Sequence, residues 1–213
     1  MTLVAGNQIT NAKTDGSSNI DAANLTMKAE NGIGADKALD VKVSNLVAYT
    51  DTGSIKVNDL DGDLVIGGVT SNLGLDNQYG LDAADGDIEV GTTGNLTINE
   101  TVAAYDSGAV RLNAGGDIQQ NARIRAENGD ISVTAGGDIQ QDARINTNDA
   151  GNIVVSAGGD FRQNADIETE NGNISVSADG DITMAANART AAYQTGNIAV
   201  TAGQNAIQML SLI

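Results

Sequence analysis

Four aspartates recur at one position of a repeated pattern, and each directly follows a glycine: Asp117, Asp138, Asp160 and Asp181. Such a row of carboxylates could bind calcium or a cationic ligand, because hard cations prefer oxygen ligands. Aspartate at a turn can instead accept hydrogen bonds from nearby backbone N–H groups. We expect this second role, with counterions attracted only because neighbouring carboxylates repel each other.

The acidic stretch from Asn58 to Asp63 resembles the beginning of an EF-hand calcium loop. It lacks the glycine at the sixth position from Asp59 and the closing glutamate of that loop. The nonapeptide repeat of RTX proteins is absent as well, and Leu64 and Ile66 fit inward positions of a strand. The sequence therefore predicts no cofactor and no dedicated metal site, and calcium binding only of a weak, non-specific kind.

Glutamines form a second row, at Gln120, Gln141 and Gln163. Their amides could hydrogen-bond to one another from repeat to repeat, satisfy polar groups at a corner of the chain, or form a strip that binds glycans. We expect a structural role. A separate pattern places Arg144 one repeat before Asp166, which predicts a solvent-exposed ion pair between them.

One segment departs from the repeat, since residues 67–85 form a longer, irregular coil. Within it, Asp76, Asn77, Gln78 and Tyr79 together resemble a carbohydrate-contacting group. Loops that protrude from rigid scaffolds often carry binding residues. The competing interpretation is a loop that covers one edge of a coil and binds nothing.

The composition excludes several classes of function. The chain of 213 residues contains no cysteine, histidine, proline or tryptophan, and 28 acidic against 11 basic side chains give a net charge of −17. Thiol nucleophiles, Ser-His-Asp triads, zinc fingers and disulfides are therefore excluded. No nucleic-acid partner is expected, because phosphate neutralisation needs Lys and Arg, and base stacking needs aromatic rings. The carboxylates are dispersed rather than opposed in the pairs that glycosidases use, so the sequence predicts no enzyme.

The elements that position these residues follow from an internal repeat. Glycines at positions 86, 108, 129, 151, 172 and 196 open similar segments, at intervals of 22, 21, 22, 21 and 24 residues. Aliphatic residues alternate after each glycine, as in Ile131 and Val133, and two further aliphatic positions follow, as at Ile139 and Ile145. Each unit therefore contains three short strands separated by Gly, Asn or Asp.

Three short strands in a unit of about 21–22 residues predict an all-β fold, a parallel β-helix or solenoid. Each unit is one coil, and a spacing of about 4.8 Å between roughly ten coils gives a rod about 45 Å long. Parallel crossovers are nearly always right-handed, which predicts a right-handed helix. The lack of proline fits strands that are paired on both edges, and glycine is expected to supply corners with positive φ.

Residues 1–213 are expected to form a single solenoid segment cut from a longer rod. The first residues, MTLVAG, match the middle of a coil, and the last, NAIQMLSLI, include no charged or polar cap. No apolar run is long enough to span a membrane, so no membrane insertion is expected. Uncapped coils expose strand edges, which predicts end-to-end self-association.

Two consecutive units carry a family resemblance: GDISVTAGGDIQQDARINT (129–147) and GNIVVSAGGDFRQNADIET (151–169). They resemble repeats of filamentous-haemagglutinin-type bacterial surface proteins, and the segment from Asn31 to Gly68 is similar to a pattern of giant adhesins in that group. The resemblance covers nearly the whole chain. It implies a large extracellular protein of a Gram-negative bacterium, exported through an outer-membrane transporter, and it assigns no functional residues.

Sequence and resemblance together predict a structural shaft segment of a secreted or cell-surface bacterial adhesin, a stiff spacer or display rod in attachment. Its partners would be a host or neighbouring-cell surface or glycans, contacted through the full-length protein. The alternative is a carbohydrate-binding or carbohydrate-cleaving β-helix that uses the long coil around residues 67–85.

Overall fold

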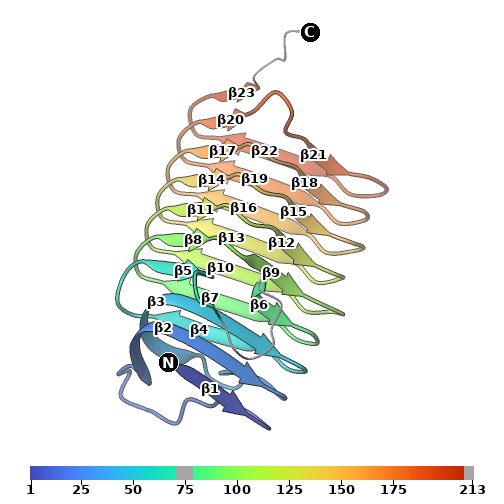
Figure 1. Cartoon of the computed structure of the whole chain (residues 1–213). Coiled ribbons are helices and arrows are strands. Elements are labelled where there is room, and N and C mark those ends of the chain that lie inside the picture. Colours follow the sequence, from blue (N-terminus) through green and yellow to red (C-terminus); the bar gives the residue numbers. More distant parts are fainter. Residues whose placement is uncertain (71–78, 209–213) are drawn as a thin grey trace.

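The computed structural model describes residues 1–70 and 79–208, which form a parallel β-solenoid of about nine turns (Figure 1). The described residues contain strands and no helix. Each regular coil contributes one strand to each of three faces, and the strands of successive coils pair in parallel. The predicted all-β solenoid with three short strands per coil is confirmed, with about nine turns in place of ten.

The three faces are stacks of corresponding strands. The first face contains β4 (Ile55–Asp59), β7 (Ile88–Thr92), β10 (Val110–Ala114), β13 (Ile131–Ala135), β16 (Ile153–Ala157), β19 (Ile174–Ala178) and β22 (Ile198–Ala202). The second contains β5 (Leu64–Ile66), β8 (Leu96–Ile98), β11 (Ile118–Gln120), β14 (Ile139–Gln141), β17 (Phe161–Gln163), β20 (Ile182–Met184) and β23 (Ala206–Gln208). The third contains β1 (Thr2–Ala5), β6 (Tyr79–Ala83), β9 (Thr101–Ala104), β12 (Ile124–Ala126), β15 (Ile145–Thr147), β18 (Ile167–Thr169) and β21 (Thr190–Ala192).

The first coils are built from longer strands. β2 (Ile20–Ala29) and β3 (Leu39–Thr50) continue without interruption around corners at which the strands of later coils end. Successive parts of β3 pair with β4, β5 and β6, so this one strand contributes to all three faces. The strands β1 and β23 lie at opposite ends of the stack (Figure 1).

The core is a set of aliphatic columns parallel to the rod axis. Ile88, Val110, Ile131 and Ile153 are in direct register on the first face and are fully buried. The positions expected to point inward on the other faces are buried as well, as at Ile139. Burial of each such side chain stabilises the fold by roughly 1.5–3 kcal/mol, so the columns are the main source of stability.

The glycines have two different roles. Those with positive φ all lie at or before Gly86, for example Gly53 at 76°. In the later coils the expectation of positive φ is wrong, and glycine is present because the coils approach each other closely. A side chain on Gly137 would collide with Oδ1 of Asp117, and one on Gly136 would collide with the carbonyl oxygen of Gly115 in the preceding coil. The repeated Gly-Gly-Asp sequence is therefore a steric requirement of this corner.

The stretch 67–85, expected to be irregular, is partly regular. Residues 79–83 form β6, which pairs with β3 and β9 and shows a single register shift between Tyr79 and Leu81. Strand pairing resumes there because Leu81 and Ala83 continue the buried columns of the third face. Residues 71–78 lie outside the described part of the chain.

The coils at the two ends are more exposed than the rest. β1 pairs in parallel with β2, so the first residues do belong to a coil, as predicted. At the other end, Ile198 and Val200 continue the core columns of Ile174 and Val176 but are 45% and 44% exposed. Ile207 is 50% exposed because it is in register with Thr183, on the outer side of the second face. Within residues 1–70 and 79–208, no helix has the length and apolarity needed to cross a membrane.

Candidate binding surfaces on two faces

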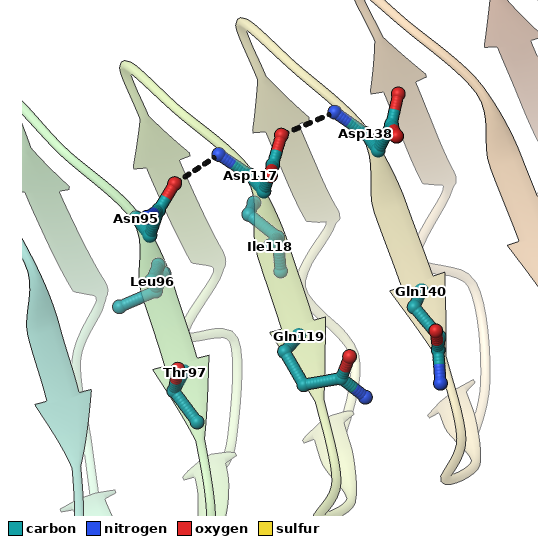
Figure 2. A pocket seen from close by; sticks show the side chains of 8 residues that line it. All are labelled: Asn95, Leu96, Thr97, Asp117, Ile118, Gln119, Asp138 and Gln140. Atoms are coloured by element: carbon teal, nitrogen blue, oxygen red, sulfur yellow. Dashed lines mark hydrogen bonds between the residues drawn. The ribbon is translucent and has the colours of Figure 1, made fainter.

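The aspartate row forms a hydrogen-bonded ladder at the corner before the second face (Figure 2). Oδ1 of Asn95 accepts the backbone N–H of Asp117, and Oδ1 of Asp117 accepts the N–H of Asp138, both at 2.8 Å. The same link continues to Asp160 and then to Asp181. The predicted turn role is confirmed, and each side chain bonds to the next coil. In the described residues, no three acidic side chains are grouped so as to hold a metal ion.

A shallow groove of about 330 Å³ runs beside this ladder on the outer side of the second face (Figure 2). It is lined by Asn95, Leu96, Thr97, Asp117, Ile118, Gln119, Asp138 and Gln140. The amides of Gln119 and Gln140 both donate to Oδ2 of Asp142, at 2.7 and 2.8 Å. Burial raises the pKa of Asp142, but hydrogen bonds from Asn164, Gln140 and Gln119 outweigh it and hold this pKa below its ordinary value. The glutamine amides of the groove therefore already bond within the chain.

The glutamine row lies inside the solenoid. Gln120, Gln141 and Gln163 are at most 1% exposed, and each Nε2 donates to the carbonyl oxygen two residues further along the chain. The predicted role at a polar corner is confirmed. The predicted hydrogen bonds between glutamines are wrong, because the Nε2 groups donate to carbonyl oxygens at the corner instead. Burial also rules out the glycan-binding strip. Oε1 of Gln120 and Oε1 of Gln141 have no partner among the described residues.

The stretch that resembles an EF-hand begins with a buried aspartate. Asp59 ends β4 with 1% exposure, and its carboxylate accepts hydrogen bonds from the N–H of Val43 at 3.0 Å and the hydroxyl of Thr92 at 3.2 Å. Burial raises the pKa of Asp59. Leu64 and Ile66 are fully buried, as predicted. The first residue of the supposed loop therefore points into the core.

The aromatic and basic side chains gather on the third face. All four tyrosines of the chain and four of its six arginines lie on or beside its outer side. We call this surface the tyrosine–arginine face, and it comprises Tyr49, Tyr79, Tyr105, Tyr193, Arg123, Arg125, Arg144 and Arg189. Sequence reasoning identified only Tyr79 among these residues as a contact candidate.

Around Tyr79 the large side chains pack against one another. The hydroxyl of Tyr105 donates to that of Tyr79 at 3.3 Å, and the Arg125 guanidinium lies 4.6 Å from the centroid of the Tyr105 ring. Ala103 occupies an outward position between Asp82 and Arg125, yet it is fully buried. These side chains thus form a small second core on the outside of the sheet.

Burial in this outer core shifts two acidic groups. It raises the pKa of Asp82 to about 6, with the positive charge of Arg125 opposing the shift. Burial first, and then the hydrogen bond with Tyr79, raises the pKa of Tyr105 to about 12. At neutral pH the tyrosine hydroxyl is therefore a hydrogen-bond donor, while the Asp82 carboxyl titrates near pH 6.

A second cluster surrounds Glu168, which is 4% exposed. Arg144 from the preceding coil and Arg189 from the following one both form ion pairs with it, and the Tyr193 hydroxyl donates to it at 2.7 Å. The predicted pair of Arg144 with Asp166 is wrong. Asp166 instead accepts the backbone N–H of Arg189 at 2.9 Å, as other corner aspartates do.

The predicted contact group is only partly placed. Tyr79 lies in the outer core, and Asp76, Asn77 and Gln78 lie outside the described residues. Asp82, Tyr105 and Arg125 were not identified as site residues, because each of these residue types does not recur at the same position of other coils. The comparison of the repeats followed residue types that do recur. Aligning outward positions of the third strand across coils would have placed Asp82 and Arg125 in one column.

Chemically, the tyrosine–arginine face offers guanidinium, phenol and carboxyl groups, which can bind and orient a polar ligand. Similarity to known proteins does not narrow that ligand further. The chain matches no family model, no curated protein and no solved structure.

Proposed function

We propose that this solenoid is a structural shaft segment of a large secreted or cell-surface bacterial adhesin of the filamentous-haemagglutinin type. In this role it is a stiff spacer or display rod in attachment. The observation that carries the proposal is the continuity of bonding along the axis. Successive coils are joined by parallel strand pairing on three faces, and again by side chains at the corners.

The corner bonding supports a mechanical role because it is continuous over many coils. The aspartate ladder extends from Asp63 to Asn205. A second ladder at the corner before the first face joins Asp130, Asn152, Asn173 and Asn197, with N···O distances of 2.8–2.9 Å. Force along the axis would therefore be shared between backbone and side-chain bonds in each coil.

The proposal places the segment outside the cell, where the full-length protein contacts a host or neighbouring-cell surface or its glycans. It assigns the segment no catalytic activity, cofactor, nucleic-acid partner or membrane insertion. End-to-end contact between copies belongs to it as well, since exposed Ile198 and Val200 offer an apolar surface in the last coil. Sedimentation at rising salt tests this contact, because screening weakens repulsion between copies.

The shaft role is tested by changing the length of the rod without breaking its register. Deletion of residues 131–152 removes one whole coil, because Ile131 and Ile153 are in register. The rod should shorten by about 4.8 Å, remain folded and still support attachment of the bacterium that carries the gene. Deletion of residues 142–152 removes half a coil and should abolish folding. Loss of attachment with a folded one-coil deletion would contradict the shaft role.

The alternative function is a carbohydrate-binding or carbohydrate-cleaving β-helix that uses the long coil around residues 67–85. It is favoured by the position of Tyr79 in the outer core, beside Tyr105. A glycan array with the intact chain and with a chain shortened between residues 67 and 78 distinguishes the two. Binding or cleavage that disappears only in the shortened chain would support the alternative.

A further inference from the structure

Two arginines of the tyrosine–arginine face have no carboxylate partner in the described residues. The ion pairs of the described residues join Arg111 to Asp87 on the first face, and Arg144 and Arg189 to Glu168 on this face. Arg123 and Arg125 are half-buried and belong to none of these pairs. The Asp82 carboxylate lies near enough for the charge of Arg125 to oppose the rise in its pKa, but no ion pair of the described residues joins the two side chains.

The polar atoms of this pair are only partly satisfied. Nε of Arg123 donates to the neutral amide oxygen of Asn146 at 2.8 Å. Nε of Arg125 is buried and has no acceptor in the described part of the chain. Burial, followed by the positive charges of Arg125 and Arg144, lowers the pKa of Arg123. An anion between the guanidiniums would relieve this repulsion and supply acceptors for their N–H groups.

The groups next to the pair suit a ligand that also carries hydroxyls. The phenol oxygens of Tyr79 and Tyr105 can donate and accept hydrogen bonds. Oδ1 of Asp82 is buried and has no donor among the described residues. The phenols suit the hydroxyls of a sugar, which an inorganic anion or an acidic side chain does not offer. We call this group the arginine-pair site, and it comprises Tyr79, Asp82, Tyr105, Arg123 and Arg125.

We propose that the arginine-pair site binds a saccharide that carries a carboxylate, such as a uronic acid unit. The guanidinium groups hold the ligand carboxylate, for which their planar fork of donors is suited. The phenols hydrogen-bond to ring hydroxyls. The site is independent of the shaft role, so its failure leaves that proposal standing.

The first experiment measures affinity by calorimetry or NMR titration, with the full chain and a trisaccharide of galacturonic acid. A galactose trisaccharide with the same linkages, inorganic sulfate and an acidic peptide are the comparison ligands. The galacturonate should bind at least tenfold more tightly than each of the others, and its affinity should fall as salt rises. Equal affinity for the neutral trisaccharide overturns the charge recognition. Equal affinity for sulfate or the peptide overturns the assignment to a saccharide.

The second experiment assigns binding to these residues. Arg125→Gln and Arg123→Gln should each weaken galacturonate binding about tenfold or more, because a charged hydrogen bond is lost. Arg162→Gln removes the same charge from an exposed position on the second face and should leave the affinity within twofold. Unchanged binding by folded Arg125→Gln overturns the site. Should that variant fail to fold, Tyr79→Phe decides, since it keeps the ring, and unchanged binding by it overturns the site as well.

Discussion

The aspartate ladder and the tyrosine–arginine face are both polar and both run along the rod, yet they are built in opposite ways. In the ladder, nearly the same residue recurs in every coil. On the face, one outward column contains Asp82, Ala103, Arg125, Asn146 and Glu168 in successive coils. Repetition marks a position that every coil needs for its corner, whereas variety marks positions that the repeated corner does not constrain. In a solenoid, binding sites are therefore best sought among outward residues that do not repeat.

The comparison rests on a common core beneath both surfaces, and the largest expected effect tests that core. Ile139 is 2% exposed and pairs in register with Ile118 and Phe161. Ile139→Asp should unfold or fray the chain, because burying an unpaired carboxylate costs several kcal/mol. Ser132→Asp, on the outer side of the first face, should be nearly neutral. Equal melting temperatures for the two variants would show that the inward assignment is wrong.

The next effect concerns an aperiodic residue with a structural role. Glu168→Ala should destabilise the fold by about 2 kcal/mol, because bonds from Arg144, Arg189 and Tyr193 to a buried carboxylate are lost. Glu170→Ala, a nearby and more exposed change, is the matched control. Chemical denaturation of both variants measures the difference, and equal stability would mean that the cluster contributes nothing.

The same variant has a predictable pH dependence. Burial raises the pKa of Glu168, but the hydrogen bonds from Tyr193 and Arg189 and the two arginine charges outweigh it, so this pKa lies below its ordinary value of 4.5. Stability from Glu168 is therefore present above pH 4.5 and is lost as the pH falls through the lowered pKa. The difference in free energy of unfolding between wild type and Glu168→Ala should therefore become smaller as the pH falls below 4.5.

A smaller effect separates hydrogen bonding from charge in the ladder. Asp138→Ala removes the acceptor for the N–H of Asp160 and should cost about 1 kcal/mol. Asp138→Asn keeps an oxygen at the same place, as Asn95 does naturally, and removes one charge from a repulsive row, so it should be neutral or slightly stabilising. If Asn were as harmful as Ala, the carboxylate charge itself would be needed, and the row would regain a role in binding.

The same contrast explains what the sequence could predict. The solenoid, its inward columns and the turn role of Asp117 and Asp138 all repeat with the coil, so alignment of the units was sufficient to find them. The ion pair was predicted with the wrong partner, Asp166, because a long arginine side chain reaches Glu168, two residues further on. Register alone does not determine such a diagonal contact.

The outer core was not predicted, for a different reason. Arg125 and Asp82 lie two coils apart in one column, with Ala103 between them. The small side chain of Ala103 lets its larger neighbours close over it, which is a property of three coils together. The role of glycine was also misjudged, because crowding by the preceding coil at Gly137 depends on the spacing between coils.

A fourth prediction concerns Asp82 in the outer core. Its pKa, raised to about 6 by burial, lies above the unfolded value of 3.8. The stabilisation that comes from its protonation is therefore present below pH 3.8 and is lost as the pH rises through 6. Asp82→Asn should stabilise the chain at pH 8 by about 1 kcal/mol after allowance for solvent screening, and by much less at pH 4. The exposed variant Asp85→Asn controls for the change in net charge, and an identical pH profile for the two would contradict the assignment.

The smallest expected effect is that of calcium on the melting temperature, through the aspartate ladder. Each ladder carboxylate uses one oxygen for the N–H of the next coil, as Asp117 does for Asp138. Consecutive charges then lie about 4.8 Å apart and repel, so a divalent cation relieves them without needing a coordination sphere. Millimolar calcium should raise the melting temperature by no more than about 3 °C, and magnesium should raise it by a similar amount. High monovalent salt should abolish this increase, because it screens the repulsion between the carboxylates. Asp138→Asn should reduce the shift. A submicromolar calcium site, or a chain that folds only with calcium, would show that this periodic row is a metal site after all.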